Sequence, residues 1–145
     1  EKISHQISYI GQETSLFQLS LKENISLQNS ITDAQFQALC KQVGLEKWIN
    51  QSTEFDTILS TASGGEKRRI DLARLLFFDR EILLFDEPTA GLDSQNRLKV
   101  EEVVKQLENK LIVYSTHQYD EEFMQQFDYC LEIQDGSIMI REINA

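Results

Sequence analysis

The chain has 145 residues, of which 41% are hydrophobic, and carries a formal net charge of -10. Its length fits one domain or part of one, and its composition is that of a globular protein rather than a disordered or fibrous one. The negative charge argues against the broad basic surface used for binding nucleic acid, and no apolar run approaches the roughly 20 residues of a membrane span. We therefore expect no nucleic-acid partner and no transmembrane segment in this sequence.

The first 80 residues predict one short strand followed by helices. The apolar run at residues 7–10 is suited to a strand, and Gly11-Gln12 ends it in a polar loop. Apolar residues at 36, 39, 40 and 43 have helical spacing, and Thr32 and Gln35 before them occupy the positions of a capping box. A shorter helical turn is expected at residues 45–49, then a loop at 52–61 and a helix at 70–78.

After residue 80 the pattern changes to alternating strands and helices. Residues 82–85 and 111–114 are continuous apolar runs, typical of strands buried on both faces of a parallel sheet. Helices are expected at 94–107 and around Phe123, Met124 and Phe127. Asp135-Gly136 separates two further apolar runs and predicts a terminal hairpin. The expected fold class is therefore α/β with a mostly parallel sheet.

The two cysteines, Cys40 and Cys130, lie among apolar neighbours. Cysteines of proteins in oxidising compartments are commonly paired, whereas cytosolic ones stay reduced. We therefore expect two reduced, buried thiols rather than a disulfide or a metal site, and a cytosolic setting.

The segment Ser63-Gly64-Gly65-Glu66 leads into the apolar helix at 70–78. Ser63 and Glu66 have capping-box spacing, and the two glycines between them allow a ligand to approach the backbone closely. Free amides and the helix dipole would converge there, which favours an anion such as phosphate. A well-capped surface helix is the alternative for this segment taken alone.

Two adjacent carboxylates, Asp86 and Glu87, end the apolar run at 82–85. Ligands of parallel sheets bind at such strand ends. Because adjacent side chains leave the chain in different directions, one carboxylate can hold a hydrated magnesium ion while the other contacts a water molecule. Helix capping before Pro88 is the structural alternative, but two neighbouring carboxylates repel unless a cation intervenes. His117 follows the next strand and is expected at the same edge, beside a phosphate group.

In this order and spacing, the segments resemble the second part of an ATP-binding-cassette (ABC) domain, the ATPase unit of transporters of that name. The resemblance covers nearly the whole chain. Ser63-Gly64-Gly65 is similar to the signature loop, residues 83–87 to the Walker B strand and residues 90–93 to the D-loop. Gln12 stands in the position of the Q-loop glutamine, and His117 in that of the switch histidine.

The resemblance implies that ATP and Mg²⁺ are bound. It makes Asp86 a metal ligand through water, with Gln12 completing the shell of the metal and the attacking water. It gives Glu87 the role of base or orienting group for that water, and places His117 at the γ-phosphate. The residues that would serve ATP held by a second nucleotide-binding domain are Ser63, Gly64, Gly65, Glu66 and Asp93.

Some positions depart from the family pattern. Ala62 replaces the usual leucine and Glu66 the more frequent glutamine, but the backbone donors and the Ser63 hydroxyl remain. Residues 54–61 lack the Gly-Glu pattern that precedes the signature loop in many exporters. Residues 12–17 and 21–25 are similar to exporter cassettes, where this stretch meets the transmembrane domain. The Ser-Gly-Gly-Glu and Ala-Gly-Leu-Asp variants are similar to those of cysteine or glutathione exporters.

None of the six glycines lies in the Gly-x-x-x-x-Gly-Lys-Ser/Thr pattern of a P-loop. We therefore expect the chain to be the C-terminal portion of one ABC ATPase domain, a partial P-loop NTPase (RecA-like) fold whose N-terminal P-loop part is absent. Residues 12–80 would form the Q-loop and the helical signature subdomain. Residues 81–145 would form the Walker B, D-loop and switch-histidine part of the α/β core.

The expected function is that of an ATPase half-site in an ABC exporter, on the cytoplasmic side of the cell membrane. Its expected partners are a second nucleotide-binding domain and the transporter's transmembrane domain, and the isolated chain is expected to be inactive. One alternative is a non-transport ABC ATPase of the DNA-repair or translation type, which the acidic composition and the exporter-like stretch disfavour. The other is a non-catalytic interaction module that docks onto a complete cassette.

Overall fold

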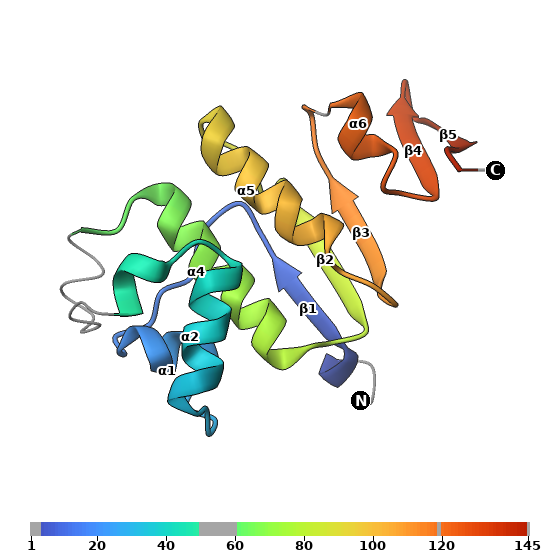
Figure 1. The fold of residues 1–145 in the computed structure, drawn as a ribbon. Helices are drawn as coiled ribbons and strands as arrows, with labels where there is room; N and C mark the ends of the chain where they lie inside the picture. Colours follow the sequence, from blue (N-terminus) through green and yellow to red (C-terminus); the bar gives the residue numbers. More distant parts are fainter. Residues whose placement is uncertain (1–3, 50–60, 119, 145) are drawn as a thin grey trace.

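The structure, a computed structural model, describes residues 4–49, 61–118 and 120–144 (Figure 1). Its elements in chain order are the 3-10 helix η1 (Ser4–Gln6), β1 (Ile7–Ile10), α1 (Leu21–Ser26), α2 (Asp33–Gln42), the 3-10 helix η2 (Glu46–Ile49), α4 (Gly64–Phe78), β2 (Ile82–Asp86), α5 (Ser94–Lys105), β3 (Leu111–Ser115), α6 (Glu121–Met124), β4 (Tyr129–Gln134) and β5 (Ser137–Glu142). The loop expected at 52–61 lies, apart from Thr61, outside the described residues. Across the described ranges, every helix falls short of the length and apolar character that crossing a bilayer requires.

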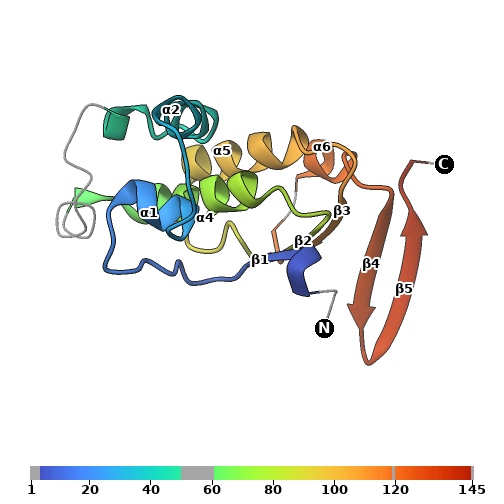
Figure 2. The same ribbon diagram turned by 90° about the horizontal axis from the view of Figure 1, so that it is seen from below.

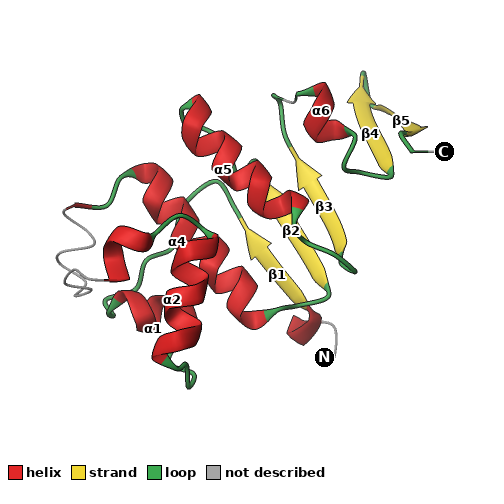
Figure 3. Ribbon diagram, in the orientation of Figure 1, coloured by secondary structure: helices red, strands yellow, loops and turns green. Residues whose placement is uncertain are grey.

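A three-stranded parallel sheet organises the chain, with β2 between β1 and β3 (Figure 3). Phe85 of β2 is aligned with Ile10 of β1 and with Tyr114 of β3. The carboxyl ends of the three strands therefore share one edge, and the residues that follow each strand lie along it. The mostly parallel sheet expected from the sequence is confirmed.

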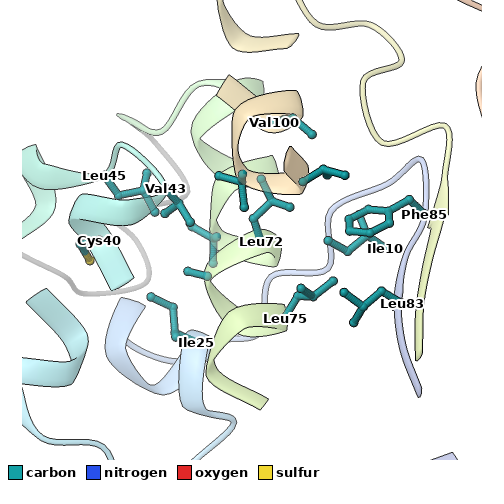
Figure 4. Packing of buried hydrophobic residues seen from close by; sticks show 14 of the residues in the cluster. Ile10, Ile25, Cys40, Val43, Leu45, Leu72, Leu75, Leu83, Phe85 and Val100 are labelled. Atoms are coloured by element: carbon teal, nitrogen blue, oxygen red, sulfur yellow. The ribbon is translucent and has the colours of Figure 1, made fainter. Parts of the chain in front are cut away.

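Helices α4 and α5 cover one face of this sheet (Figure 2). Leu83 and Phe85 of β2 point into this layer and are only 1% and 2% exposed. They belong to one buried cluster with Leu72 of α4 and Val100 of α5 (Figure 4). This layer of apolar side chains holds the strand ends and the two helices in a fixed arrangement.

The opposite face of the sheet is open within the described part of the chain. Tyr9 and Val113, which flank Leu84 in the pairing register, are 62% and 53% exposed, and Leu111 is 60% exposed. The strands expected to be buried on both faces are thus covered on one face, because the described helices that pack on the sheet lie on one side. Parallel sheets are normally covered on both faces.

The helices before residue 80 extend the core away from the sheet. Helices α1 and α2 pack against α4, and η2 packs against α2. Leu21, Leu45 and Trp48 are fully buried there. Each of α1, α2 and α4 begins with a capping box, formed by Ser20 with Glu23, by Thr32 with Gln35, and by Ser63 with Glu66.

The expected terminal hairpin forms between β4 and β5. Asp135 and Gly136 have φ values of 50° and 77°, as a two-residue type I′ turn requires. Both cysteines are free thiols, but Cys130 on β4 is only partly buried, whereas Cys40 is fully buried. The expectation of two buried thiols is therefore wrong for Cys130, because most side chains of β4 are exposed.

Candidate functional site

The carboxylate of Asp86 is held by side chains from both neighbouring strands. Its Oδ1 accepts a hydrogen bond from the Ser115 hydroxyl at 3.0 Å, and its Oδ2 accepts one from the Tyr9 hydroxyl at 3.1 Å. Ser115 is aligned with Asp86 in β3, and Tyr9 belongs to β1. The hydrogen bond to Asp86 also raises the pKa of Tyr9, which keeps its hydroxyl a donor. Asp86 itself is exposed, so an oriented carboxylate faces solvent.

Glu87 occupies a turn that β3 holds in place. Its φ is 48°, in the left-handed region that residues other than glycine rarely adopt. Its amide donates to the carbonyl oxygen and to the hydroxyl oxygen of Ser115, each at 3.1 Å. Strained backbone of this kind persists where the surroundings impose it, and it is concentrated at functional sites.

His117 lies at this edge, as the sequence predicts, and its imidazole contacts Glu87 there. The imidazole Nε2 lies 2.6 Å from Glu87 Oε1. The side chain of His117 is 86% exposed, whereas that of Glu87 is 23% exposed. An exposed imidazole therefore stands beside a half-buried carboxylate and is open to a ligand.

Gln12 follows β1 at the same edge of the sheet and is exposed. Its carbonyl oxygen and that of Gly11 accept hydrogen bonds from the guanidinium group of Arg68 in α4. The structure thus fixes the backbone at Gln12 and leaves the residue open to solvent. The predicted contact of its side chain with a metal ion stays a prediction.

Ser63 and Glu66 form the predicted cap of α4. Ser63 Oγ accepts from the amide of Glu66 at 3.2 Å, and Glu66 Oε2 accepts from the amide of Ser63 at 2.9 Å. Glu66 Oε1 lies 2.6 Å from Lys47 Nζ. Burial raises the pKa of Glu66, but the bonds from Lys47 and Ser63 outweigh it and lower the pKa overall. The carboxylate therefore serves the cap and an ion pair, and its predicted contact with a nucleotide stays a prediction.

The two glycines of this loop have different surroundings. A Cβ atom on Gly65 would lie 2.4 Å from the side chain of Asn96 in α5, whereas one on Gly64 would meet nothing within 4 Å. Gly65 therefore lets α4 and α5 approach closely, and Gly64 leaves the backbone open. The first amides of a helix have no acceptor within it, so this loop can present donors to an anion.

Asp93 caps α5 next to the same loop. Its Oδ1 accepts from the amide of Asn96 at 2.9 Å, and its Oδ2 accepts from Asn96 Nδ2 at 2.7 Å. These bonds lower the pKa of Asp93 and keep it ionised. Asn96 Oδ1 accepts in turn from Arg69 of α4. Asn96 thus joins Asp93 to the helix that Ser63 begins.

Asp86 is an exposed carboxylate that could contact a metal ion. Within residues 4–49, 61–118 and 120–144, no group of three or more His, Cys, Asp or Glu side chains could hold a metal. Mg²⁺ is commonly bound through one or two carboxylates, with water and phosphate oxygens as its remaining ligands. An exposed, oriented Asp86 fits a metal that arrives with a nucleotide.

A model of the ABC transporter family matches residues 1–90. The chain belongs to the ABC transporter family. It is 33% identical over 147 residues to the ATP-binding/permease protein CydC of the glutathione/L-cysteine transport system of Haemophilus influenzae. That alignment covers 96% of this chain and 25% of the relative, so the chain spans about a quarter of that protein's length.

Two solved structures share the fold of this ABC transporter family member. A bacterial Atm1-family ABC exporter with ATP bound matches with a TM-score of 0.80 and 21% identity, over 97% of this chain and 26% of that chain. A dimeric ATP-binding cassette in a post-hydrolysis state, bound to ADP and Pi, matches with a TM-score of 0.76 and 24% identity, over 99% of this chain and 66% of that chain. The likeness confirms the expected ABC ATPase (P-loop NTPase) fold.

Several residues of the ABC site are not evident from the motifs. Ser115 and Tyr9 orient Asp86, and Arg68 holds the backbone at Gln12. The pairing of strands could have indicated Ser115, because a residue ending β3 must lie near one ending β2. No pattern in the sequence indicates the contact of Arg68 with a loop 56 residues earlier.

Proposed function

We propose that the chain forms the ATP-binding and ATP-hydrolysing half-site of an ABC exporter. The observation that carries this proposal is the 2.6 Å contact between Glu87 and His117, beside Asp86 at the end of β2. Two carboxylates and an imidazole at one edge of a parallel sheet suit the transfer of a phosphoryl group to water, which depends on positioning and on charge stabilisation.

Asp86 and Gln12 would hold Mg²⁺, Asp86 through water. The metal, when bound with ATP, neutralises negative charge on the phosphate oxygens. Ser115 and Tyr9 keep the Asp86 carboxylate in one orientation, so little reorganisation is needed when ATP binds. The exposed position of Asp86 supports this role.

Glu87 would orient the attacking water and accept its proton. The strained turn and the two bonds from its amide to Ser115 hold the carboxylate at the strand edge. His117 would donate to an oxygen of the γ-phosphate and stabilise the charge that develops there. Its exposure and its contact with Glu87 place the imidazole where it can serve both groups.

A second nucleotide-binding domain would supply the ATP that the signature loop contacts. The residues proposed for that interface are Ser63, Gly64, Gly65, Glu66 and Asp93. The open backbone at Gly64 and the link from Asp93 through Asn96 to α4 support one shared surface. The dimeric state of one solved structure with this fold, bound to ADP and Pi, supports it further.

The second proposed partner is a transmembrane domain. The relative in Haemophilus influenzae is an ATP-binding/permease protein, and the first structural match is an exporter, which favours transport over DNA repair or translation. Coupling to a transmembrane domain would put the chain on the cytoplasmic side of a membrane, where ATP is available.

Glu87→Gln in the full-length protein tests this function. The substitution keeps the size of the side chain but removes the base, so ATP should bind while turnover is lost and ATP-bound cassette dimers accumulate. Glu102→Gln makes the same change at an exposed position of α5 and is the matched control for steady-state hydrolysis. Near-normal hydrolysis by Glu87→Gln would contradict the proposal.

A further inference from the structure

Helix α4 holds the loop that carries Gln12 by the backbone. Arg68 donates to the carbonyl oxygens of Gly11 and Gln12. Six residues further along the helix, Arg74 donates to the carbonyl oxygen of Ser15 at 3.0 Å. Two side chains of one helix therefore fix three carbonyl groups of a loop more than 50 residues earlier in the chain.

The far side of this loop is fixed as well. Asn24 of α1 is fully buried, and its side chain accepts from the amide of Phe17 at 2.9 Å and donates to the carbonyl oxygen of Leu19 at 2.8 Å. Arg74 Nε donates to the carbonyl oxygen of Asn24 itself at 2.7 Å. The loop between β1 and α1 is thus tied to α4 along its length.

The side chains that link α4 to this loop are charged and buried. Arg68 and Asp71 are 3% and 7% exposed, and Asp71 lies between the two arginines, 3.8 Å from Arg68 and 3.0 Å from Arg74. Taking such charges out of water is costly, and apolar side chains of similar volume often stabilise a core equally well. The guanidinium group provides what an apolar side chain does not, which is a planar fork that fixes two carbonyl oxygens in one orientation.

The same helix begins at the signature loop. Ser63 caps α4, and Arg68 follows five residues later, less than two turns along a rigid element. A displacement of the signature loop on contact with a ligand would therefore displace the guanidinium group of Arg68. The carbonyl groups of Gly11 and Gln12, which Arg68 holds, would move with it.

We propose that Arg68 is a positioning residue, which sets the place of Gln12 at the nucleotide site according to the position of the signature helix. This inference rests on the proposed function of the site. Arg68 touches no reacting atom; it acts through Gln12. Asp71 balances its charge, and Arg74 and Asn24 fix the rest of the loop.

A double-mutant cycle in the full-length protein tests the proposal. Gln12→Ala and Arg68→Met should each lower kcat about tenfold, because a small misplacement of a catalytic group is costly. The double variant should be no slower than the slower single variant, since both changes remove the same contribution. Effects that multiply would overturn the proposal, as would an Arg68→Met protein with normal kcat.

Arg69→Met is the matched control. Arg69 is the next residue of the same helix and is 5% exposed, but it donates to Asn96 rather than to the loop. Its effect on kcat, whatever its size, should multiply with that of Gln12→Ala. Arg68→Lys covers the case in which Arg68→Met does not fold, since it keeps the charge beside Asp71 but cannot bind both carbonyl oxygens as a fork. It should show the same coupling to Gln12→Ala.

Hydrogen exchange of the same proteins separates this inference from the proposed function, because it requires no turnover. Backbone amides of residues 12–17 should exchange severalfold faster in Arg68→Lys than in wild type, and at the wild-type rate in Arg69→Met. Equal exchange in all three proteins would overturn the role of Arg68 even if ATP is hydrolysed. Faster exchange in Arg68→Lys without any ATPase activity in wild type would support the link and reject the function.

Discussion

The hydroxyl group of Ser115 lies between Asp86, which ends β2, and Glu87, which follows it: the hydroxyl donates to Asp86 Oδ1 at 3.0 Å and accepts from the amide of Glu87 at 3.1 Å. One oxygen atom therefore orients a carboxylate and a turn at the same time. The pairing of Ser115 with Asp86 in the β2–β3 register makes this contact possible. A group that serves two neighbours in this way should matter for catalysis without contacting the nucleotide.

Ser115→Ala should lower kcat about ten- to a hundredfold, since a hydrogen bond to a charged group contributes about 1.5–3 kcal/mol. The Michaelis constant for ATP should change little. Steady-state hydrolysis at saturating Mg²⁺ measures both quantities. Ser115→Thr keeps the hydroxyl group and should recover most of the turnover, so equal defects in the two variants would show that the hydroxyl is not responsible.

The signature loop offers a test in which steric and electrostatic effects are separated. Gly64→Asp places a carboxylate in open space, where it should repel the γ-phosphate of ATP held by a partner domain and abolish ATP-dependent dimerisation, without changing the melting temperature appreciably. Dimerisation is measured by size-exclusion chromatography in the presence of ATP, with Gly64→Asp added to a protein that already carries Glu87→Gln. If the protein with Gly64→Asp dimerises as readily as the protein without it, the loop is only a helix cap.

Gly65→Ala should act through the fold instead. The added Cβ atom would lie 2.4 Å from Asn96, which is already held by Asp93 and Arg69. We expect a loss of about 1–3 kcal/mol in stability, as for other overpacked sites. Thermal unfolding of the variant measures it. A melting temperature equal to that of wild type would show that α5 moves aside without cost.

The sequence predicted the strands and longer helices because their patterns are long or unbroken. The apolar runs of β2 and β3 and the helical spacing of α2 identified these elements. Helix α1, only six residues long, was not expected, although Ser20 and Glu23 form a capping box that could have indicated it. Helix α6 is one turn, and Phe127 lies beyond it, packed on Phe123 with ring centroids 5.3 Å apart. Short helices depend on such tertiary contacts more than on their own pattern.

The candidate site was predictable where a motif names adjacent residues, as for Asp86 and Glu87. The position of His117 at the same sheet edge as Glu87 follows from the pairing of the two apolar strands that precede them, whereas the 2.6 Å contact between the two side chains was not predicted. The supporting contacts of Tyr9 and Arg68 were not predictable. They depend on the register between β1 and β2 and on how α4 docks on the loop, and neither quantity is encoded in the spacing of residues.

Asp71 should make stability depend on pH. Burial raises its pKa from 3.8 to about 6, against the opposing effect of Arg74 and Arg68. Between these two values the folded state holds a proton that the unfolded state releases, so the stabilisation is present at low pH and is lost as pH rises through about 6. Relative to Asp71→Asn, the free energy of unfolding of wild type should fall by no more than about 3 kcal/mol over this window. Parallel pH profiles of the melting temperatures would contradict this.

A protein consisting of these 145 residues alone should neither hydrolyse ATP nor remain monomeric. The sequence has no P-loop pattern. Asp86, Glu87 and Gln12 could therefore contact a metal ion and water, but no loop of backbone amides would bind the phosphates of ATP. In the described sheet β3 has β2 on one side only, and Leu111 and Val113 on its open face are more than half exposed. Unpaired apolar edges of this kind recruit other chains.

Calorimetry with Mg-ATP and light scattering on this protein test the two expectations separately. We expect no measurable hydrolysis, weak ATP binding at best, and particles larger than a monomer that shrink when Val113 is changed to Lys. The charge at this position disfavours pairing at the edge. A monomer that binds ATP with micromolar affinity would contradict both expectations, and association unaffected by Val113→Lys would place the contact elsewhere.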